Sequence, residues 1–303
     1  MVTILLRQGA GSARALRDNF AMSQDSTFHY PRVLTIAGSD SGGGAGIQAD
    51  LKTIAALGCF GMTAITALTA QNTCGVRAIH GVPPQMLRDQ IDAVIEDIGA
   101  HAVKIGMLHA PEIVQTVAEA IDRHALPNVV FDPVMVATSG AVLIEQASMD
   151  VLVRELFPRA ALITPNLDEA GLLVGKPLAS TEDMEGAALA LRAQGARAVL
   201  VKGGHLPGET VIDLLLTESG EKIWMKAPRI QSANTHGTGC TLSSAIASHL
   251  ALGESLVEAV RAARLYVREA LQSGAQVRTG NCGGPLNHSH SPVTMHLRPL
   301  QHA

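Results

Sequence analysis

The sequence predicts a three-layer α/β/α sandwich with a mainly parallel central sheet. Short aliphatic runs alternate with helical stretches along the chain, which is the pattern of repeated β-α-β units. The chain is 47% hydrophobic but has only one Trp, two Tyr and five Phe, so Ala, Val, Leu and Ile must form most of its core. Strands that are buried on both faces of a parallel sheet have this composition. No internal linker or repeat interrupts the pattern, so we expect a single α/β domain.

Glycine, proline and turn residues set the limits of the predicted elements. Gly38 ends the first strand at 33–37, and Gly58 closes the first helix at 45–57. Pro111 marks the first turn of a helix, and Ser219-Gly220 marks the turn of a β-hairpin. On the same signals we expect further strands at 63–67, 102–105, 129–131, 161–163 and 198–201, a hairpin of 211–216 with 222–226, and helices at 86–98, 111–124, 183–194, 241–251 and 256–273.

Composition and charge exclude several classes of protein. The net charge is -4 and no long basic run occurs, which argues against nucleic-acid binding through phosphate neutralisation. No run of about 18 uninterrupted apolar residues occurs, so the sequence predicts no membrane span. The four cysteines have neither C-x-x-C nor metal-type spacing and are predicted to be reduced thiols of a cytoplasmic protein: Cys59, Cys74, Cys240 and Cys282.

The two ends of the chain differ from its middle. Residues 1–30 combine arginines, small residues and a polar run, which predicts a disordered extension. We expect one domain over 31–290 and an irregular tail over 291–303. Four histidines lie in or near that tail, and His-rich tails are usually solvated rather than metal-bound: His288, His290, His296 and His302.

The segment 234–240, which runs into the small and apolar residues 241–247, is the most informative part of the chain. Gly237 and Gly239 allow a turn that gathers backbone N–H groups, and a helix is predicted to start there. Such a turn binds anions because unpaired amides and the positive end of the helix dipole face one point. The same field would stabilise the thiolate of Cys240. A glycine-rich turn with a buried structural cysteine remains the alternative.

A second glycine-rich segment, 38–46, follows the first strand. It does not fit the dinucleotide-binding pattern, because the position of the last required glycine is Ile47. No Walker A motif occurs, since Gly175-Lys176 is followed by Pro177. The segment predicts a backbone that approaches a small ligand closely, or else a flexible turn.

Polar and glycine residues follow nearly every predicted strand. They are Gly38-Ser39-Asp40, Gln71-Asn72, Gly106-Met107, Asp132-Pro133, Asn166 and Lys202-Gly203-Gly204. Because ligands bind at the carboxyl ends of the strands in open parallel sheets, we expect these residues to meet at one edge.

Several of these residues have more than one interpretation. Asn166 and Glu169 have the spacing of a helix capping box, or they organise Mg²⁺ near nucleotide phosphates with Asp132 as a partner. Lys202 contacts a phosphate or is a solvated lysine at a strand end. Gln71, with the two polar residues that follow it, either reads the edge of a heterocycle or belongs to a plain polar loop.

Taken together, these segments resemble the hydroxymethylpyrimidine/phosphomethylpyrimidine kinases of thiamine biosynthesis, which belong to the ribokinase-like superfamily. The resemblance runs in unbroken order over residues 32–290. The matching segments are 34–40, 43–53, 65–73, 104–108, 132–135, 164–170, 201–205 and 235–241.

The resemblance implies that ATP phosphorylates the hydroxymethyl oxygen of 4-amino-5-hydroxymethyl-2-methylpyrimidine, and then the resulting monophosphate, with Mg²⁺ as cofactor. It implies a substrate pocket of Gln71, Gly38, Asp50, Met107 and Val134, although an Asp within the first helix is more often solvated. It implies an anion hole at Gly237 and Gly239, with Cys240 and Lys202 as further catalytic residues. It also implies nucleotide contacts from Asn166, Glu169, Lys202 and Thr238, with Asp132 and Glu169 near the metal.

Cys240 separates this chain from related kinases. Sugar kinases and many pyridoxal kinases of the superfamily carry Asp at this position, and a thiol repels an already phosphorylated substrate less than a carboxylate does. We therefore expect a two-step pyrimidine kinase. A pyridoxal or pyridoxine kinase and a non-catalytic pyrimidine-binding protein with this fold remain the alternatives. The relatives also imply a homodimer without nucleic-acid or membrane partners.

Overall fold

The structure, a computed structural model, describes residues 27–135 and 146–300 of the 303-residue chain. Residues 31–296 form the main compact unit, and the described ends of the chain belong to a second, small unit. In the small unit β1 (Phe28–His29) pairs antiparallel with β11 (Arg298–Pro299).

The sequence analysis expected no strand at either end of the chain. Most of the predicted disordered extension, residues 1–26, lies outside the described residues. Residues 291–296, which were assigned to the tail, contribute hydrogen bonds from Val293 and His296 to the backbone of residues 56 and 58. The predicted domain boundaries stay a prediction.

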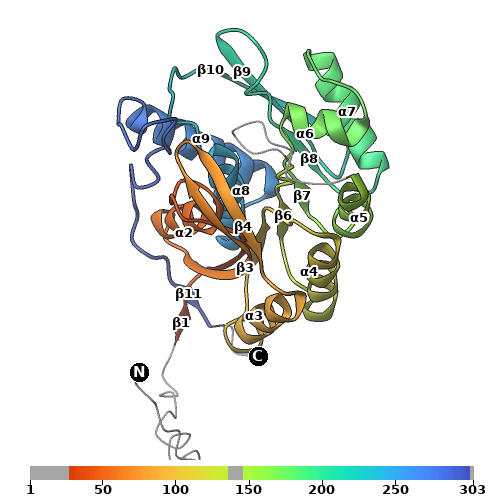
Figure 1. Cartoon of the computed structure of the whole chain (residues 1–303), viewed down its shortest axis with the longest axis vertical. Helices are drawn as coiled ribbons and strands as arrows, with labels where there is room; N and C mark the ends of the chain where they lie inside the picture. The colour runs from red at the N-terminus through yellow and green to blue at the C-terminus, as the bar shows by residue number, and fades with distance from the viewer. Residues whose placement is uncertain (1–26, 136–145, 301–303) are drawn as a thin grey trace, which may run out of the picture. The chain divides into compact units, whose positions relative to one another are not determined.

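A nine-stranded sheet runs through the main unit in the order β10-β9-β8-β7-β6-β5-β2-β3-β4 (Figure 1). The strands from β8 to β3 in this order are parallel, whereas the pairs β3–β4, β8–β9 and β9–β10 are antiparallel. The sheet is therefore mainly parallel, as predicted. Its strands are β2 (Arg32–Asp40), β3 (Phe60–Asn72), β4 (Gly75–Gly81), β5 (Ala102–Ile105), β6 (Val129–Phe131), β7 (Leu162–Ile163), β8 (Val199–Val201), β9 (Thr210–Leu216) and β10 (Lys222–Pro228).

Helices cover both faces of the sheet and complete the three layers (Figure 1). One layer packs on the core that contains Leu34 and Phe131, and the other on the core that contains Val33 and Val130. Neighbouring strand residues thus serve opposite cores, because side chains alternate along a strand. The first layer consists of α3 (Pro84–Asp97), α4 (Pro111–His124), α5 (Gln146–Leu156), α6 (Leu167–Val174) and α7 (Thr181–Ala193), and the second of α2 (Gly46–Ala56), α8 (Thr238–Ala251) and α9 (Leu256–Gly274).

The predicted strands and helices are present with end shifts of up to three residues, except that β3 runs five residues beyond its predicted end. Gly38 lies inside β2 and does not end it. The sequence pattern does not predict β4 or α5. Arg77 and the other central residues of β4 are exposed, so this antiparallel edge strand has no buried aliphatic run to indicate it. Within the described ranges, no helix combines the length and apolar character that crossing a membrane requires.

The prediction of four reduced cysteines is wrong for two of them. Cys74 and Cys282 form a disulfide across a sequence separation of 208 residues. Cysteine spacing indicates pairs that lie close together in the sequence. These two positions are far apart in the sequence, and only the folded chain brings them together. Cys59 and Cys240 are thiols, as expected.

A buried ion pair links the sheet to α2. Lys104 on β5 donates to both carboxylate oxygens of Asp50 at 3.0 and 2.9 Å, and both side chains are fully buried. Thr35 and Ser244 also donate to this carboxylate, at 2.6 Å each. Burial opposes the charge on Lys104, but Asp50 and the nearby Cys240 and Asp132 hold its pKa above the ordinary value.

Removing one partner of this buried ion pair is expected to destabilise the protein much more than removing one partner of an exposed ion pair. Lys104→Met leaves the Asp50 carboxylate buried without a counter-charge, which should lower the free energy of unfolding by about 3–5 kcal/mol. Urea denaturation followed by circular dichroism measures the loss. Arg197→Met, which breaks the exposed pair with Glu218, is the matched control and should leave the unfolding midpoint nearly unchanged. Similar midpoints for the two variants would contradict this account.

Candidate active site

The carboxyl ends of the parallel strands bring the predicted residues to one edge of the sheet. Each of six strands from β2 to β8 ends beside one of them, because parallel strands all point the same way. In chain order these residues are Gly38, Gln71, Met107, Asp132, Asn166 and Lys202.

The predicted turn into a helix is confirmed at Gly237. This residue has φ +83°, and α8 begins at Thr238. A Cβ at Gly237 would lie 1.8 Å from the carbonyl oxygen of Gly44, so only glycine fits there. Among the residues that the structure describes, the N–H groups of Gly239 and Cys240 have no backbone acceptor. Two amides at the start of α8 are therefore available to an anion.

The glycine-rich loop that follows β2 holds a carboxylate of the chain itself. The side chain of Asp40 accepts from the N–H groups of Gly42, Gly44 and Ala45 at 2.8, 3.1 and 2.8 Å. His236, in the turn before α8, lies 3.0 Å from the same carboxylate. Burial opposes ionisation of Asp40, but the hydrogen bonds from His236 and from the loop hold the pKa of this carboxyl below its ordinary value.

The expectation that the loop backbone approaches a ligand stays a prediction for the part of the loop that does not bind Asp40. Three amides of the loop already serve Asp40. The sequence analysis assigned no role to Asp40 or His236. The only sequence signal was the Asp-x-Gly spacing of Asp40 and Gly42, in which the carboxylate accepts from an N–H two residues further on.

Gln71 lies close to the turn before α8. Its amide nitrogen is 3.4 Å from Nε2 of His236, and its amide oxygen accepts from Thr69 at 3.2 Å. The side chain is partly exposed and therefore accessible to a ligand. The structure thus brings the predicted heterocycle-binding residue next to the predicted anion site.

The other predicted pocket residues occupy different positions. Met107 lies against Gly38, where an added Cβ would be 2.7 Å from the methionine methyl carbon. Val134 is partly exposed and donates its N–H to the carbonyl of Asp132 at 2.8 Å. Asp50 does not line a pocket directly, because it is fully buried and held by the ion pair described above. Both readings of Asp50, solvated residue and substrate contact, are corrected.

Lys202 connects two carboxylates beside α8. Its ammonium group lies 2.8 Å from Asp132 and 3.9 Å from Glu169. It is therefore not a solvated strand-end lysine. A Cβ at Gly239 would lie 3.3 Å from both Asp132 and the Lys202 nitrogen, which places this cluster directly beside the start of α8.

The two carboxylates of this cluster differ in their protonation. Burial opposes ionisation of Asp132, but Lys202 and Lys104 hold its pKa below the ordinary value. Burial raises the pKa of Glu169 to about 7; Lys202 acts against this rise and Asp132 adds to it. Glu169 also completes the predicted capping box with Asn166, in which each side chain bonds the backbone N–H of the other. The structural interpretation of this pair is thus confirmed.

The oxygen donors here suit a metal that is shared with phosphates. Mg²⁺ in nucleotide sites is held by one or two carboxylates, with phosphates and water completing its coordination. Asp132 and Glu169 supply such donors beside a lysine and a helix N-terminus. Within the described ranges, no group of three or more His, Cys, Asp or Glu side chains is arranged to hold a metal by itself.

The surroundings of Cys240 favour its neutral thiol form. Burial raises its pKa to about 11; Lys104 and a hydrogen bond from the N–H of Gly46 act against this rise, while Asp50 and Asp132 add to it. This direction agrees with the expected neutral thiol, and stabilisation of the thiolate by the start of α8 stays a prediction.

A family model described as phosphomethylpyrimidine kinase matches residues 40–287. The chain belongs to this family. It is 48% identical over 259 residues to the hydroxymethylpyrimidine/phosphomethylpyrimidine kinase of Rhizobium meliloti, and the match covers 85% of this chain and 97% of that protein. The predicted family and enzyme class, a kinase of thiamine biosynthesis, are confirmed.

Two further similarities bear on domain content and fold. The kinase is 49% identical over 261 residues to the thiamine biosynthesis bifunctional protein ThiED of Geobacter sulfurreducens, covering 86% of this chain but only 53% of that protein. It thus spans about half the length of that relative. The crystal structure of an ADP complex of Bacillus subtilis pyridoxal kinase matches with a TM-score of 0.80 and 36% identity, over 86% of this chain and 98% of that one. The predicted ribokinase-like fold is confirmed.

The raised pKa of Cys240 predicts how this thiol reacts. Alkylation by iodoacetamide requires the thiolate, so its rate should rise about tenfold per pH unit from pH 8 to pH 10 without a plateau. Mass spectrometry of the peptide that contains Cys240 measures the rate, and Cys240→Ala is the control for labelling elsewhere. A rate that levels off near pH 8 would show that the thiolate is stabilised after all.

Proposed function

We propose that this kinase transfers the γ-phosphoryl group of ATP to the hydroxymethyl oxygen of 4-amino-5-hydroxymethyl-2-methylpyrimidine. It then transfers a second phosphoryl group to the monophosphate, which yields the diphosphate. The observation that carries the proposal is the start of α8. There, the amides of Gly239 and Cys240 adjoin the Lys202 cluster, and His236 in the turn just before them lies beside Gln71.

The pyrimidine side of the site is formed by Gln71, Gly38, Met107 and Val134. The amide of Gln71 offers both a donor and an acceptor, which matches the amino group and ring nitrogen of an aminopyrimidine. Thr69 donates to the oxygen of that amide and so orients it. Met107 supplies a flexible apolar surface against Gly38, where a ring stacks without competing for hydrogen bonds.

The nucleotide side is formed by Asn166, Glu169, Lys202 and Thr238, with Asp132 beside them. Lys202 donates to Asp132 through one of its three N–H groups, so its ammonium also serves a phosphate oxygen as a point charge. Mg²⁺ bound with the nucleotide would be held by Asp132 and Glu169, directly or through water, and would neutralise phosphate charge.

The transfer requires little covalent chemistry from the protein. The hydroxymethyl oxygen forms a bond to the γ-phosphorus, the bond from that phosphorus to the bridging oxygen breaks, and ADP and the hydroxyl proton leave. In the second step a phosphate oxygen of the monophosphate is the attacking atom. The amides of Gly239 and Cys240 face the oxygens of the transferring group, where they stabilise its charge without rearranging.

Cys240 keeps this position uncharged. With a pKa of about 11 the side chain is neutral at pH 7, whereas an Asp there would place a negative charge beside the phosphorylated substrate of the second step. We infer that the cysteine is present because it permits the second transfer.

Phosphorylation of pyridoxal is the second candidate activity. It is favoured by the similarity to Bacillus subtilis pyridoxal kinase, and both substrates are small hydroxymethylated nitrogen heterocycles. The homodimer, the cytoplasmic location and the lack of nucleic-acid and membrane partners stay predictions.

A substrate comparison tests the proposed activity. Purified protein with Mg-ATP should convert hydroxymethylpyrimidine to its monophosphate and then to its diphosphate, with a kcat/KM at least about tenfold above that for pyridoxal, since the site discriminates by its polar contacts. Chromatography of the reaction mixture separates the three pyrimidine species. Lys202→Met should be nearly inactive, and Lys222→Met, which changes an exposed lysine, should retain activity. A preference for pyridoxal, or no turnover of either substrate, would overturn the proposal.

The role of Cys240 has its own test. Cys240→Asp should lower kcat/KM for the second phosphorylation about tenfold more than for the first, because the new carboxylate repels the phosphorylated substrate. Cys240→Ser, which is neutral and of similar size, should reduce the two steps by equal factors. Both rates are measured with each isolated substrate. If Asp impairs the two steps equally, the electrostatic explanation fails.

A further inference from the structure

The disulfide between Cys74 and Cys282 lies next to the site but has no part in the transfer. Cys74 lies in the turn between β3 and β4, three positions after Gln71. Cys282 belongs to the segment 277–287 that follows α9. Both cysteines are exposed to solvent, which is the condition for attack by an external thiol.

The segment 277–287, which the disulfide ties to the turn after Gln71, contacts two parts of the site. On one side, Thr73 lies against the segment 277–287: a Cβ at Gly280 would be 2.5 Å from its hydroxyl oxygen, and this oxygen accepts from the N–H of Cys282 at 3.4 Å. On the other side, the carbonyl of Gly284 accepts from the N–H of His236 at 3.2 Å. The segment thus connects the turn after Gln71 to the turn before α8.

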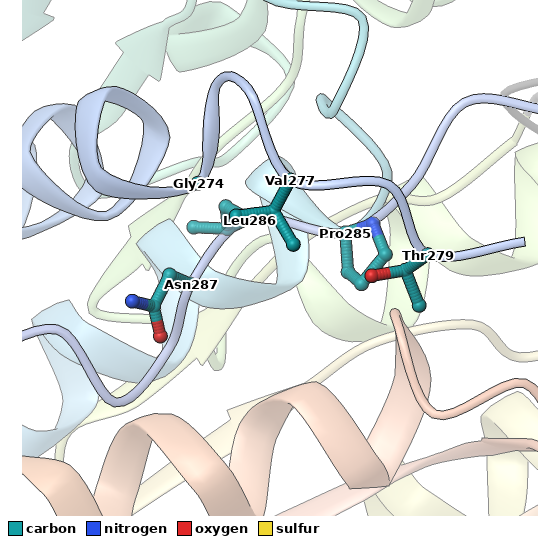
Figure 2. A pocket seen from close by; sticks show the side chains of 6 residues that line it. All are labelled: Gly274, Val277, Thr279, Pro285, Leu286 and Asn287. Carbon is teal, nitrogen blue, oxygen red and sulfur yellow. The ribbon is translucent and has the colours of Figure 1, made fainter.

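Packing supports the two halves of this segment differently: Leu286 is buried in the core, whereas residues 277–283 are exposed. It contains no helix or regular strand, and a cavity of about 310 Å³ lies against it. Figure 2 shows its side chains around that cavity, whose lining residues are Gly274, Val277, Thr279, Pro285, Leu286 and Asn287. The side chain of Asn234 holds the segment through bonds to the carbonyl of Val277 and the N–H of Gly284. The position of the exposed half, residues 277–283, therefore depends on a few hydrogen bonds and on the disulfide.

We propose that Cys74–Cys282 is a reversible redox modification site that controls how tightly the kinase holds its pyrimidine. A dithiol reductant attacks one sulfur, and a mixed disulfide forms. Its second thiol then releases the protein, so that two electrons and two protons convert the bond to two thiols while the reductant becomes a disulfide. Reduction frees the turn after Gln71 from the segment that supports His236. The effect on pyrimidine binding rests on the proposed function, whereas the redox site itself does not.

The test uses the full-length oxidised protein before and after dithiothreitol. Reduction should raise the thiol count from two to all four cysteines. It should raise the KM for hydroxymethylpyrimidine roughly threefold to tenfold, with a smaller effect on kcat, because the pyrimidine contact is displaced. Oxidised glutathione should restore the original KM.

Variants separate this disulfide from other effects of the reductant. Cys282→Ser and Cys74→Ser should each have the KM of the reduced enzyme and should not respond to dithiothreitol. Cys59→Ser, which changes a buried thiol outside the disulfide, should respond as the natural protein does.

Hydrogen exchange tests the redox site without depending on catalysis. Hydrogen exchange followed by mass spectrometry should show faster exchange over residues 232–242 after reduction, whether or not the protein phosphorylates the pyrimidine. Four thiols in the air-oxidised protein, or full reduction with no change in exchange there, would overturn the inference. No turnover in either redox state, with faster exchange on reduction, would overturn the proposed function and leave the redox site standing.

Discussion

The carboxylate of Asp40 is the interaction on which the arrangement of the site depends. It lies at the end of β2, and it binds three amides of the loop before α2 and the ring of His236 before α8. One side chain therefore holds two helix starts against the same strand end. The absence of a Cβ at Gly237 allows the carbonyl of Gly44 to approach it closely. These contacts hold the backbone at the start of α8 in place. Its amides are therefore oriented before any substrate binds, which is what electrostatic stabilisation requires.

The charges beneath α8 are arranged in pairs. Asp50 is matched by Lys104, and Asp132 by Lys202, so that neither carboxylate adds an uncompensated negative charge next to the site. Glu169 differs, because its pKa of about 7 leaves it partly protonated at neutral pH. Bound cations favour the ionised form of a carboxylate, and its charge thus adjusts to the presence of a metal-bound nucleotide. The amides of α8 then provide the main field that acts on an incoming phosphate.

The sequence was sufficient to predict where the strands end and which residues lie there. It was insufficient to predict which distant side chains pair with one another. Apolar runs that end in Gly, Asp or Lys have a local cause, and parallel strands bring their ends together whatever else the chain does. Whether Asp50 of α2 is solvated or buried depends instead on Lys104, a residue 54 positions away on β5. The pairing of Cys74 with Cys282 depends on the path of the chain after α9. Such pairings follow from the assembled fold and leave no trace in the local sequence pattern.

The state of Cys240 follows from the same surroundings. A helix start alone lowers the pKa of a cysteine, but here burial and two neighbouring carboxylates raise it to about 11. A thiol with this pKa is a poor general base for the first transfer. In a loose phosphoryl-transfer transition state, however, the attacking oxygen loses its proton late, and positioning and charge stabilisation supply most of the rate. A neutral side chain at this position therefore lowers the rate of the first transfer little. It also avoids the repulsion between an aspartate and the phosphorylated substrate of the second transfer.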